Sequence, residues 1–535
     1  MKQFLLNIVV FFLCFQVMSQ SQFHVFPKND KVNPGTPYGN GSIEKPWDLQ
    51  TALNQKNNIV NAGDVIWMHE GIYTGHFVSN LKSGSLSNQI TLSSFPGEWA
   101  VLNGNISKKG TVLTVKGDGV TFKDFEITWL GNFSRKEGQK NFGRGDGINH
   151  LSGIDCKFIN LVIHDNPGLG FGSWKSTGGT LIDNCLIFNN GFVSKNGKGR
   201  GEGMYVQNKS EAQRIIKNNI IFNNYYKGIE VWSANKRGSY LWVKNVSLTN
   251  NVIFNSGNPS GALKDNLIVA TDDRNGINIA KNIKVIDNIF YHNADFSKNQ
   301  IGGDAASLTL GFHSNAPIEN TEVLGNIVIG RNNALRILYA NSLSFKNNIV
   351  YSGYTHVFKP SLNDIKLKDW DFSNNIYYTK NSTPFIISKQ KISFPDWKKT
   401  LKLDLNSQHK RIKDFNLKPI LDITRNEYKP NNYRVVLFDK FGEDIKVDFS
   451  KYNIPKNTTY KIYDIENRKE VLISAKITSD FMIHFPMNTK PFQKPLHNEK
   501  SQKTLNNFGV FIIEFETTQI KKRKGFFKRL FERLF

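Results

Sequence analysis

Short apolar triplets recur along this chain, and each follows an asparagine or, once, an aspartate. The residues that precede the triplets are Asp124, Asn160, Asn184, Asn219, Asn251, Asn288, Asn326, Asn348 and Asn375. Successive instances are 22 to 38 residues apart. The triplets are rich in β-branched and aromatic residues, which favours strands over helices. A repeat of this period predicts stacked units, none of which buries its apolar face alone.

An asparagine at a fixed place before each strand is typical of a tight bend. Its amide bonds to local backbone, it tolerates a left-handed φ, and successive copies can stack as a ladder. Other apolar segments, at residues 147–150, 203–206, 228–232, 308–313 and 335–338, indicate a further strand in each repeat. We therefore expect each repeat to hold a first strand, a turn, a second strand, the asparagine bend and a third strand.

The chain has 535 residues, too many for one compact core but suited to a solenoid with accessory domains. Residues 1–19 have the charged start, apolar stretch and cleavage site of a signal peptide. We expect the coil and its N-terminal cap over 23–380, with a cap helix near 46–53. A C-terminal cap or linker should cover 381–425. Alternating strands over 426–518 predict a small β-sandwich, and 519–535 form a basic amphipathic tail.

The net charge of +24 indicates a polyanionic partner. No nucleic-acid-binding module is recognisable, so nucleic acid is not expected. An acidic polysaccharide or oligosaccharide fits better with export to the periplasm or the extracellular space; the alternative is a generally basic surface without a specific partner. The tail is expected either to touch an anionic membrane surface peripherally or to dock on the sandwich. We expect a monomer.

The segment from Lys45-Pro46-Trp47 through Gly63-Asp64-Val65-Ile66 to Gly71-Ile72-Tyr73, the asparagine column and the Gly-Ile-x-Val strands carry a family resemblance. Over residues 23–380 the chain resembles the right-handed parallel β-helix, or pectate-lyase-like, superfamily of secreted carbohydrate-active proteins. Residues 426–518 are similar to the sandwich that follows such enzymes in polysaccharide-degrading Bacteroidetes. The resemblance implies an all-β fold, a right-handed parallel β-helix followed by a small sandwich.

The superfamily contains polysaccharide lyases, glycoside hydrolases, epimerases and phage adhesins, and the fold does not choose among them. The full calcium-binding aspartate cluster and the basic signature of the familiar pectate and alginate lyases are not found in this sequence. We therefore assign no cofactor and no metal ligand, and calcium stays open.

Alternation along the first strands predicts which side chains leave the coil. If Ile229, Val231 and Phe312 point inward, their neighbours point outward onto one sheet. The expected floor of a groove consists of Tyr205, Glu230, Trp232, His313 and Arg336, and its edge of Arg144, Asp146, Arg200, Glu202 and Lys227. The segment 198–203, in which charge alternates with glycine, is the best single pointer to a site.

Two mechanisms fit this set, and β-elimination on a uronic acid is preferred. Arg336, Arg200 or Lys227 would neutralise the carboxylate, and Tyr205, His313 or Lys227 would move a proton. The leaving group is a glycosidic oxygen in a polysaccharide lyase, or a hydroxyl in a dehydratase acting on unsaturated uronyl oligosaccharides. The alternative is glycoside hydrolysis by carboxyls among Glu202, Glu230 and Asp146.

Several of these residues also have a purely structural interpretation. Trp174 and Trp232 would stack on sugar rings under either mechanism, or in a non-catalytic glycan-binding protein, the third hypothesis. Outward Glu and Arg on a sheet are commonly cross-strand pairs, Tyr205 could pack at the rim, and residues 144–146 could form a turn. Asp272 and Asp273 suggest a surface loop rather than a weak metal site.

Overall fold

The structure is a computed structural model that describes residues 20–107, 109–295, 305–357, 367–387 and 389–516. The predicted signal peptide and the predicted basic tail (519–535) lie outside the described residues. Within the described ranges, no helix has the length and apolar character needed to span a membrane.

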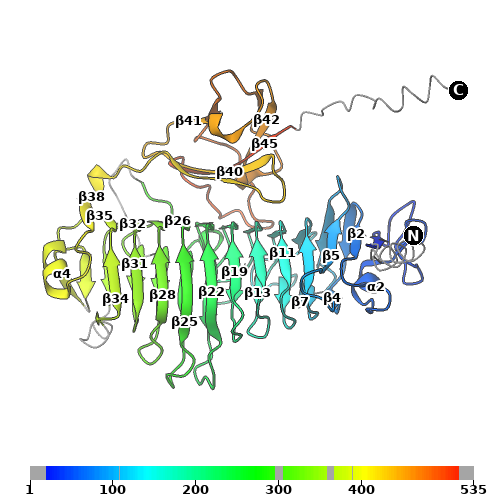
Figure 1. The fold of residues 1–535 in the computed structure, drawn as a ribbon, viewed down its shortest axis with the longest axis horizontal. Helices are drawn as coiled ribbons and strands as arrows, with labels where there is room; N and C mark the ends of the chain where they lie inside the picture. Colours follow the sequence, from blue (N-terminus) through cyan, green and yellow to red (C-terminus); the bar gives the residue numbers. More distant parts are fainter. Residues whose placement is uncertain (1–19, 108, 296–304, 358–366, 388, 517–535) are drawn as a thin grey trace, which may run out of the picture.

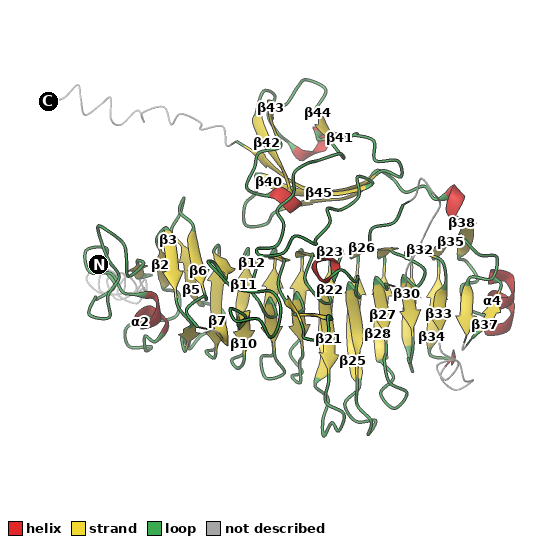
Figure 2. Cartoon of the chain, turned by 180° about the vertical axis from the view of Figure 1, so that it is seen from behind, coloured by secondary structure: helices red, strands yellow, loops and turns green. Residues whose placement is uncertain are grey.

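Three long sheets run side by side along the molecule, each with twelve strands among the described residues (Figures 1 and 2). Sheet A consists of β1 (Gln22–Val25), β2 (Val65–Met68), β5 (Ile90–Ser94), β8 (Val120–Lys123), β11 (Lys157–Ile159), β14 (Leu181–Asp183), β19 (Arg214–Lys217), β22 (Val243–Thr249), β25 (Ala280–Ile286), β28 (Glu319–Leu324), β31 (Leu343–Lys346) and β34 (Trp370–Ser373). Sheet B consists of β3 (Gly71–Thr74), β6 (Ala100–Asn103), β9 (Glu126–Thr128), β12 (Val162–His164), β15 (Leu186–Phe188), β20 (Ile220–Phe222), β23 (Val252–Phe254), β26 (Ile289–Tyr291), β29 (Ile327–Ile329), β32 (Ile349–Ser352), β35 (Ile376–Thr379) and β38 (Gln408–Arg411). Sheet C consists of β4 (Phe77–Ser79), β7 (Lys109–Val115), β10 (Arg144–His150), β13 (Phe171–Ser173), β18 (Met204–Val206), β21 (Ile229–Ser233), β24 (Leu267–Thr271), β27 (Leu308–Leu310), β30 (Leu335–Ile337), β33 (Thr355–Val357), β36 (Phe385–Ile387) and β37 (Gln390–Ile392).

The chain visits sheets C, A and B in turn, so each repeat supplies one strand to each sheet. Neighbouring strands pair in parallel, apart from the antiparallel pair β36–β37 at the end of sheet C. This confirms the predicted right-handed parallel β-helix. The helical sheets continue past residue 380, where the coil was predicted to end, as far as β38.

Short helices close the two ends of the coil. At the N-terminal end, α2 (Leu49–Leu53) begins after Asp48, whose carboxylate accepts a hydrogen bond from the backbone N–H of Thr51 at 2.9 Å. At the other end, α4 (Phe394–Leu401) places the Trp397 ring on that of Phe385, with centroids 4.3 Å apart. Each helix thus covers apolar side chains that the terminal coils leave without a neighbour.

The asparagine column proves to be two columns, one residue apart. In the first three instances the named residue (Asp124, Asn160 or Asn184) has a left-handed φ of 54–58° and starts the bend. In the later repeats that place belongs to the preceding residue, for example Asn218 with φ 58° and Asn250 with φ 54°. The prediction of one column in constant register is therefore wrong, because a second asparagine follows the bend in the later repeats.

The second column is a buried amide ladder inside the coil. Its six members have almost no exposed surface, and each Nδ2 donates to the Oδ1 of the next at 2.9–3.2 Å. The ladder consists of Asn219, Asn251, Asn288, Asn326, Asn348 and Asn375. It ends on Asp404, which accepts from Asn375 at 2.9 Å. The predicted stacking of asparagines is thus present, at the position that faces inward.

The C-terminal segment folds into two packed sheets. The larger sheet is antiparallel and consists of β39 (Ile420–Arg425), β40 (Asn432–Phe438), β42 (Thr459–Asp464), β43 (Ile473–Lys476) and β45 (Phe508–Phe515). The smaller consists of β41 (Ile445–Asp448) and β44 (Met482–Phe485). Buried side chains such as Val435, Val447 and Phe485 fill the space between them. This arrangement matches the predicted small β-sandwich.

The sandwich covers the outer face of sheet B (Figure 1). Apolar residues of both parts form one buried cluster there, and the rings of Tyr291 and Phe508 stack with centroids 4.2 Å apart. Sheet B is thereby closed to a long ligand over much of its length. Sheet C, seen from behind the first view in Figure 2, is not covered by the sandwich.

Candidate active site

Tyr205, Glu230 and Arg336 lie in one row across the outer face of sheet C. Tyr205 pairs in register with Glu230. The row continues from Glu230 through Ile268 and Thr309 to Arg336. Four strand spacings of about 4.8 Å place the ends of this row about 19 Å apart. These three residues of the predicted floor therefore share one continuous surface.

A second row lies three residues before the first, at the edge of the same sheet. Gly170, Gly203 and Gly228 donate backbone hydrogen bonds to the carbonyls of the residues that precede the next strand, at 2.9–3.1 Å. Those acceptors are Glu202, Lys227 and Asp265. The stacking brings a carboxyl, an ammonium and a second carboxyl together in three successive coils.

Lys227 joins the two rows. Its Nζ forms an ion pair with Oε1 of Glu230, and it lies 4.9 Å from the ring centroid of Tyr226 and 5.4 Å from that of Trp232. Burial alone lowers the pKa of Lys227, but the charges of Glu230 and Asp265 raise it on balance. Lys227 is therefore protonated at neutral pH, and it stabilises negative charge more readily than it accepts a proton.

Arg336 is held by two residues that the sequence analysis missed. Its Nη2 lies 2.6 Å from Oδ1 of Asp265, and its Nε donates to Thr309 Oγ1 at 3.1 Å. Burial raises the pKa of Asp265, but the charges of Arg336 and Lys227 lower it on balance. A signal for Asp265 was available, because it occupies the same place before Leu267 that Lys227 occupies before Ile229.

Glu202 lines a pocket of about 430 Å³ beside this cluster. Arg144, Lys195 and Arg200 contribute the cationic groups of the same pocket, and Glu137 a second carboxylate. Arg200 belongs to a short antiparallel hairpin outside the three long sheets, made of β16 (Phe192–Val193) and β17 (Gly199–Arg200). Burial and then the charge of Glu230 raise the pKa of Glu202 to about 7. A carboxyl with this pKa exchanges its proton near neutral pH.

Aromatic rings border the two rows. The rings of Trp174 and Tyr205 lie 5.2 Å apart, and Trp174 donates from Nε1 to Oδ1 of Asn149 at 2.9 Å. Burial and the charge of Glu230 raise the pKa of the Tyr205 hydroxyl. Tyr205 therefore keeps its proton and can act as a donor.

Arg214, on β19, supports Trp174 from inside the coil. It is fully buried, and its guanidinium donates to the carbonyl of Trp174 at 3.4 Å and to the carbonyl and hydroxyl of Thr177. Burial lowers the pKa of Arg214 to about 9. The turn that presents Trp174 is thus fixed to the second strand of the following coil.

The prediction that Phe312 faces inward is wrong. Gly311 has a φ of 79°, which ends the alternation of β27. Phe312 is consequently 44% exposed and packs edge-on against Trp232, with centroids 4.9 Å apart. His313 lies beyond this turn, where its Nδ1 accepts from the backbone N–H of Asn315 at 3.2 Å. No contact between His313 and Tyr205 or Arg200 is found among the described residues.

Arg144 and Asp146 are the first polar residues of β10. Asp146 accepts from the backbone N–H of Leu169 at 2.9 Å and from Asn149 at 3.1 Å. Arg144 is exposed, and its Nε is 3.8 Å from Asp146. Arg144 therefore remains accessible to a ligand, whereas Asp146 mainly organises the backbone.

Asp272 and Asp273 lie in a structured turn. Asp272 pairs with Arg274 at 2.7 Å, and Asp273 accepts from the backbone N–H groups of Gly238, Ile277 and Asn278. Within the described part of the chain, no group of three or more His, Cys, Asp or Glu side chains is arranged to hold a metal ion.

Comparison with known proteins gives partial matches. Pectate lyase L of Thermoclostridium stercorarium is 24% identical over 295 residues, covering 43% of this chain and 23% of that protein. The match thus spans less than a quarter of the relative's length. No family model matches the chain.

Two solved structures also align with the chain. Pectate lyase Pel9A aligns over 71% of this chain and 83% of its own, with 16% identity and a TM-score of 0.41. GH136 lacto-N-biosidase of Eubacterium ramulus aligns over 73% of this chain and 68% of its own, with 11% identity and a TM-score of 0.42. The predicted pectate-lyase-like fold rests on the three parallel sheets of this chain itself.

Proposed function

We propose that this protein is a carbohydrate-active lyase that acts on an acidic polysaccharide or oligosaccharide by β-elimination. The observation that carries the proposal is the Glu202 pocket, where a carboxyl with a pKa of about 7 lies among Arg144, Lys195 and Arg200. Elimination needs cationic groups to neutralise a uronate carboxylate and a base whose pKa is near the working pH. The 24% identity to a pectate lyase supports the same class of reaction.

In this proposal Arg144 and Arg200 bind the uronate carboxylate and acidify the adjacent C–H. Ionised Glu202 removes that proton, the electron pair forms the ring double bond, and the bond to the leaving oxygen breaks. Tyr205, which holds its proton, donates to the departing oxygen. The leaving group is a glycosidic oxygen in a polysaccharide lyase and a hydroxyl in a dehydratase.

A glycoside hydrolase is the second candidate, and one observation favours it. The charge of Glu230 contributes to the raised pKa of Glu202. A carboxyl with a raised pKa beside a second carboxyl is typical of the acid and its partner in glycoside hydrolysis. Under this alternative, protonated Glu202 is the acid.

The test is to mix the purified protein with uronate-rich glycans and their unsaturated oligomers, and to follow ultraviolet absorbance and product mass. A lyase creates a new absorbance, a dehydratase removes water from a product, and a hydrolase adds water on cleavage without absorbance. We expect E202Q to reduce the rate by about 10²–10⁴-fold, the usual contribution of an acid–base group. E322Q, on the exposed face of sheet A, is the matched control. No change in any acidic or neutral glycan would refute the enzyme hypothesis and leave glycan binding alone.

Export is part of the proposal and is tested separately. The feature that supports it is the signal-like sequence of residues 1–19. Mass spectrometry of the protein from the periplasm or the culture medium should find a mature N-terminus close to residue 20. An intact N-terminus in the cytoplasmic fraction would contradict export.

A further inference from the structure

A hollow lies between the coil and the sandwich. Its volume is about 1230 Å³. Its walls come from residues 132–141, from the hairpin at 193–197 and from residues 497–500 near the end of the sandwich. It shares Glu137, Ser194 and Lys195 with the Glu202 pocket, so the two hollows adjoin around the hairpin.

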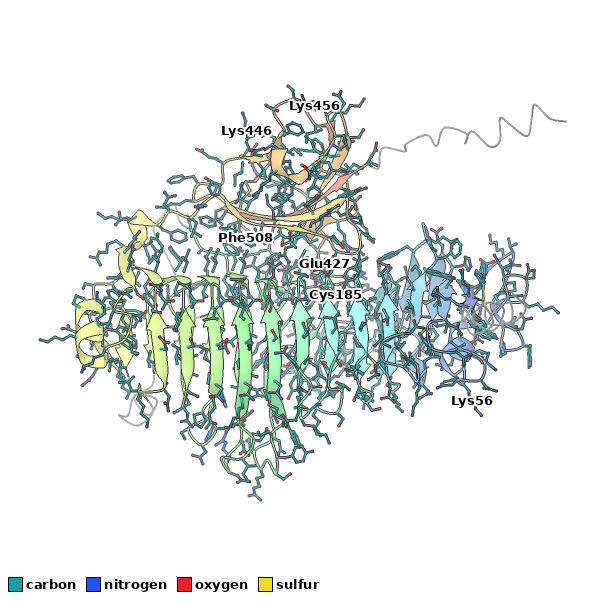
Figure 3. The ribbon with its side chains drawn as sticks, viewed as in Figure 1. Lys56, Cys185, Glu427, Lys446, Lys456 and Phe508 are labelled. Carbon is teal, nitrogen blue, oxygen red and sulfur yellow. The ribbon has the colours of Figure 1, made fainter. Side chains whose placement is uncertain are left out.

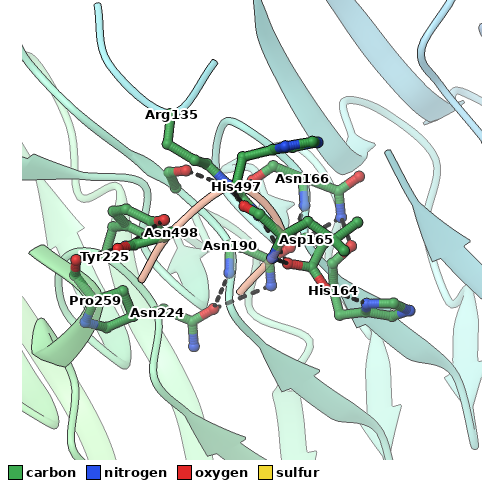
Figure 4. Close-up of polar contacts among 12 residues, drawn as sticks. Arg135, His164, Asp165, Asn166, Asn190, Asn224, Tyr225, Pro259, His497 and Asn498 are labelled. Atoms are coloured by element: carbon green, nitrogen blue, oxygen red, sulfur yellow. Dashed lines mark hydrogen bonds and ion pairs between the residues drawn. The ribbon is translucent and has the colours of Figure 1, made fainter. Parts of the chain in front are cut away.

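The sandwich side of this hollow is fixed to the coil by a segment that we name the strap, residues 494–504. Buried Arg135 donates to the carbonyl of Leu496 at 3.0 Å and forms an ion pair with Asp165 at 2.8 Å. Asn498 donates to the hydroxyl of Tyr225 and to the carbonyl of Pro259, both at 2.7 Å (Figure 4). A wall held in this way is largely formed before any ligand arrives.

The charge of the lining selects the ligand. Four exposed lysines face two carboxylates, and one of those carboxylates, Glu499, is paired with Lys494 at 2.6 Å. Lys136, Lys140 and Lys500 form no ion pair with any residue that the structure describes. Their charges are therefore available to a polyanion.

The uncharged lining points to sugar hydroxyls. It includes the amides and hydroxyls of Asn132, Ser134, Gln139, Asn141, Ser194 and Ser260. The aromatic members Phe133 and Tyr225 are buried, so neither ring is exposed to a ligand in the hollow. Amides and hydroxyls arranged among cations suit an acidic glycan, which carries both hydroxyls and anionic groups.

We propose that this hollow is a second binding site, built jointly by the coil and the strap, for further sugar units of the acidic glycan whose reacting unit lies in the Glu202 pocket. The identity of the ligand rests on the proposed function. The continuity of the two hollows lets one chain occupy both. The sandwich then serves binding as well as covering sheet B.

The test measures binding in an E202Q background, in which turnover is expected to be slowed by about 10²–10⁴-fold. The probes are end-labelled oligogalacturonates, one long and one a disaccharide, at fixed ionic strength. We expect K136E/K140E/K500E to weaken binding of the long probe by about tenfold or more and to leave the disaccharide unchanged. The matched control is K446E/K456E/K476E, which makes the same change in charge on exposed lysines of the sandwich, of which Lys446 and Lys456 lie far from the coil (Figure 3).

An equal loss in both triple variants, or no loss in the first, would overturn the proposal. So would equally tight, lysine-dependent binding of duplex DNA, which would indicate non-specific attraction of polyanions. The proposed reaction and the proposed second binding site can be refuted independently. If the wild type cleaves nothing but K136E/K140E/K500E still weakens glycan binding selectively, the proposed reaction falls and this site stands. If cleavage occurs and the triple variant binds normally, only this site falls.

Discussion

Tyr205 and Glu230 face the same side of sheet C as direct register partners on β18 and β21, although 25 residues separate them in the chain. The charge of Glu230 raises the pKa values of both Tyr205 and Glu202, and the same carboxylate pairs with Lys227. One residue thus influences the donor, the proposed base and the nearest cation. A change at Glu230 should therefore alter the pH dependence of the reaction as well as its rate.

The pH dependence distinguishes the two candidate reactions. Below its pKa of about 7 Glu202 is protonated, and above it Glu202 is ionised. If Glu202 is the base of an elimination, kcat/KM rises as pH increases through 7; if it is the acid of a hydrolysis, kcat/KM falls. E230Q removes a charge that raises this pKa. The pH at which kcat/KM changes should therefore move to a lower value in either case. An unchanged pH dependence of kcat/KM in E230Q would contradict the proposed role of Glu202. E322Q is again the control.

A second pH effect concerns the junction between the coil and the sandwich. Both ring nitrogens of His164 donate to carboxylates, one to Glu126 and one to Asp165, each at 2.8 Å. Arg468 of the sandwich binds Glu126 at 2.8 Å, and the strap amide of Leu496 binds Asp165 at 2.8 Å. Burial lowers the pKa of His164, but its hydrogen bonds to Asp165 and Glu126 raise it on balance above the ordinary 6.5.

Because folding raises this pKa, the imidazolium stabilises the fold fully below about pH 6.5 and loses that effect as pH rises through the folded-state pKa. We expect H164Q to lower the free energy of unfolding at pH 6. The loss should be on the order of 3 kcal/mol, as for a broken buried ion pair. The difference from wild type should shrink at alkaline pH. Urea unfolding at several pH values measures this, with H484N, an exposed site, as the control. A constant difference would show that His164 is not charged in the fold.

The two asparagine columns predict different costs for similar substitutions. Asn288 accepts from the backbone N–H and the Nδ2 of Asn251, and it donates to Asn326 at 3.1 Å. N288A leaves several buried groups without partners, at about 1–3 kcal/mol each. Asn184 occupies the left-handed bend position, which glycine also adopts readily. We expect N288A to shift the urea midpoint strongly and N184G to shift it little; equal shifts would contradict the distinction between the columns.

The same columns show how far the sequence determines the fold. The period of the asparagines and the β-branched triplets predicted the coil, because each strand buries one face and repeats its bend. The one-residue offset between the two columns was not predicted. In the early repeats Leu161 and Cys185 occupy the inward position that asparagines occupy later. Pattern alone does not say which of two adjacent positions faces inward when both can hold asparagine.

The site was predictable where strand alternation holds and not where it ends. Tyr205, Glu230 and Arg336 fall in one row because alternation and register are regular over β18 to β30. Phe312 was misplaced because Gly311 turns the backbone after β27. The place of Asp265 before its strand was a local signal, but its pairing with Arg336, 71 residues away in the chain, was not predictable from it. Partners that meet across several coils cannot be identified from local spacing.

Arg336 and Arg200 were both predicted to bind substrate, and the structure gives them different surroundings. The guanidinium of Arg336 is already engaged by Asp265 and Thr309, and the Asp265 side chain is only 9% exposed. R336M would leave that carboxylate with Lys227 as its nearest cation, so we expect a loss of about 1–3 kcal/mol in stability and a small change in KM.

Arg200 is exposed and lines the Glu202 pocket. R200Q should therefore raise KM for an acidic glycan with little change in the unfolding midpoint, because a cation that binds only the substrate contributes nothing to the free protein. Measuring both quantities for both variants separates a structural cross-strand pair from a ligand-binding arginine. The opposite pattern, in which R336M raises KM and R200Q destabilises the fold, would move the carboxylate-binding site from the pocket to the far end of the row on sheet C.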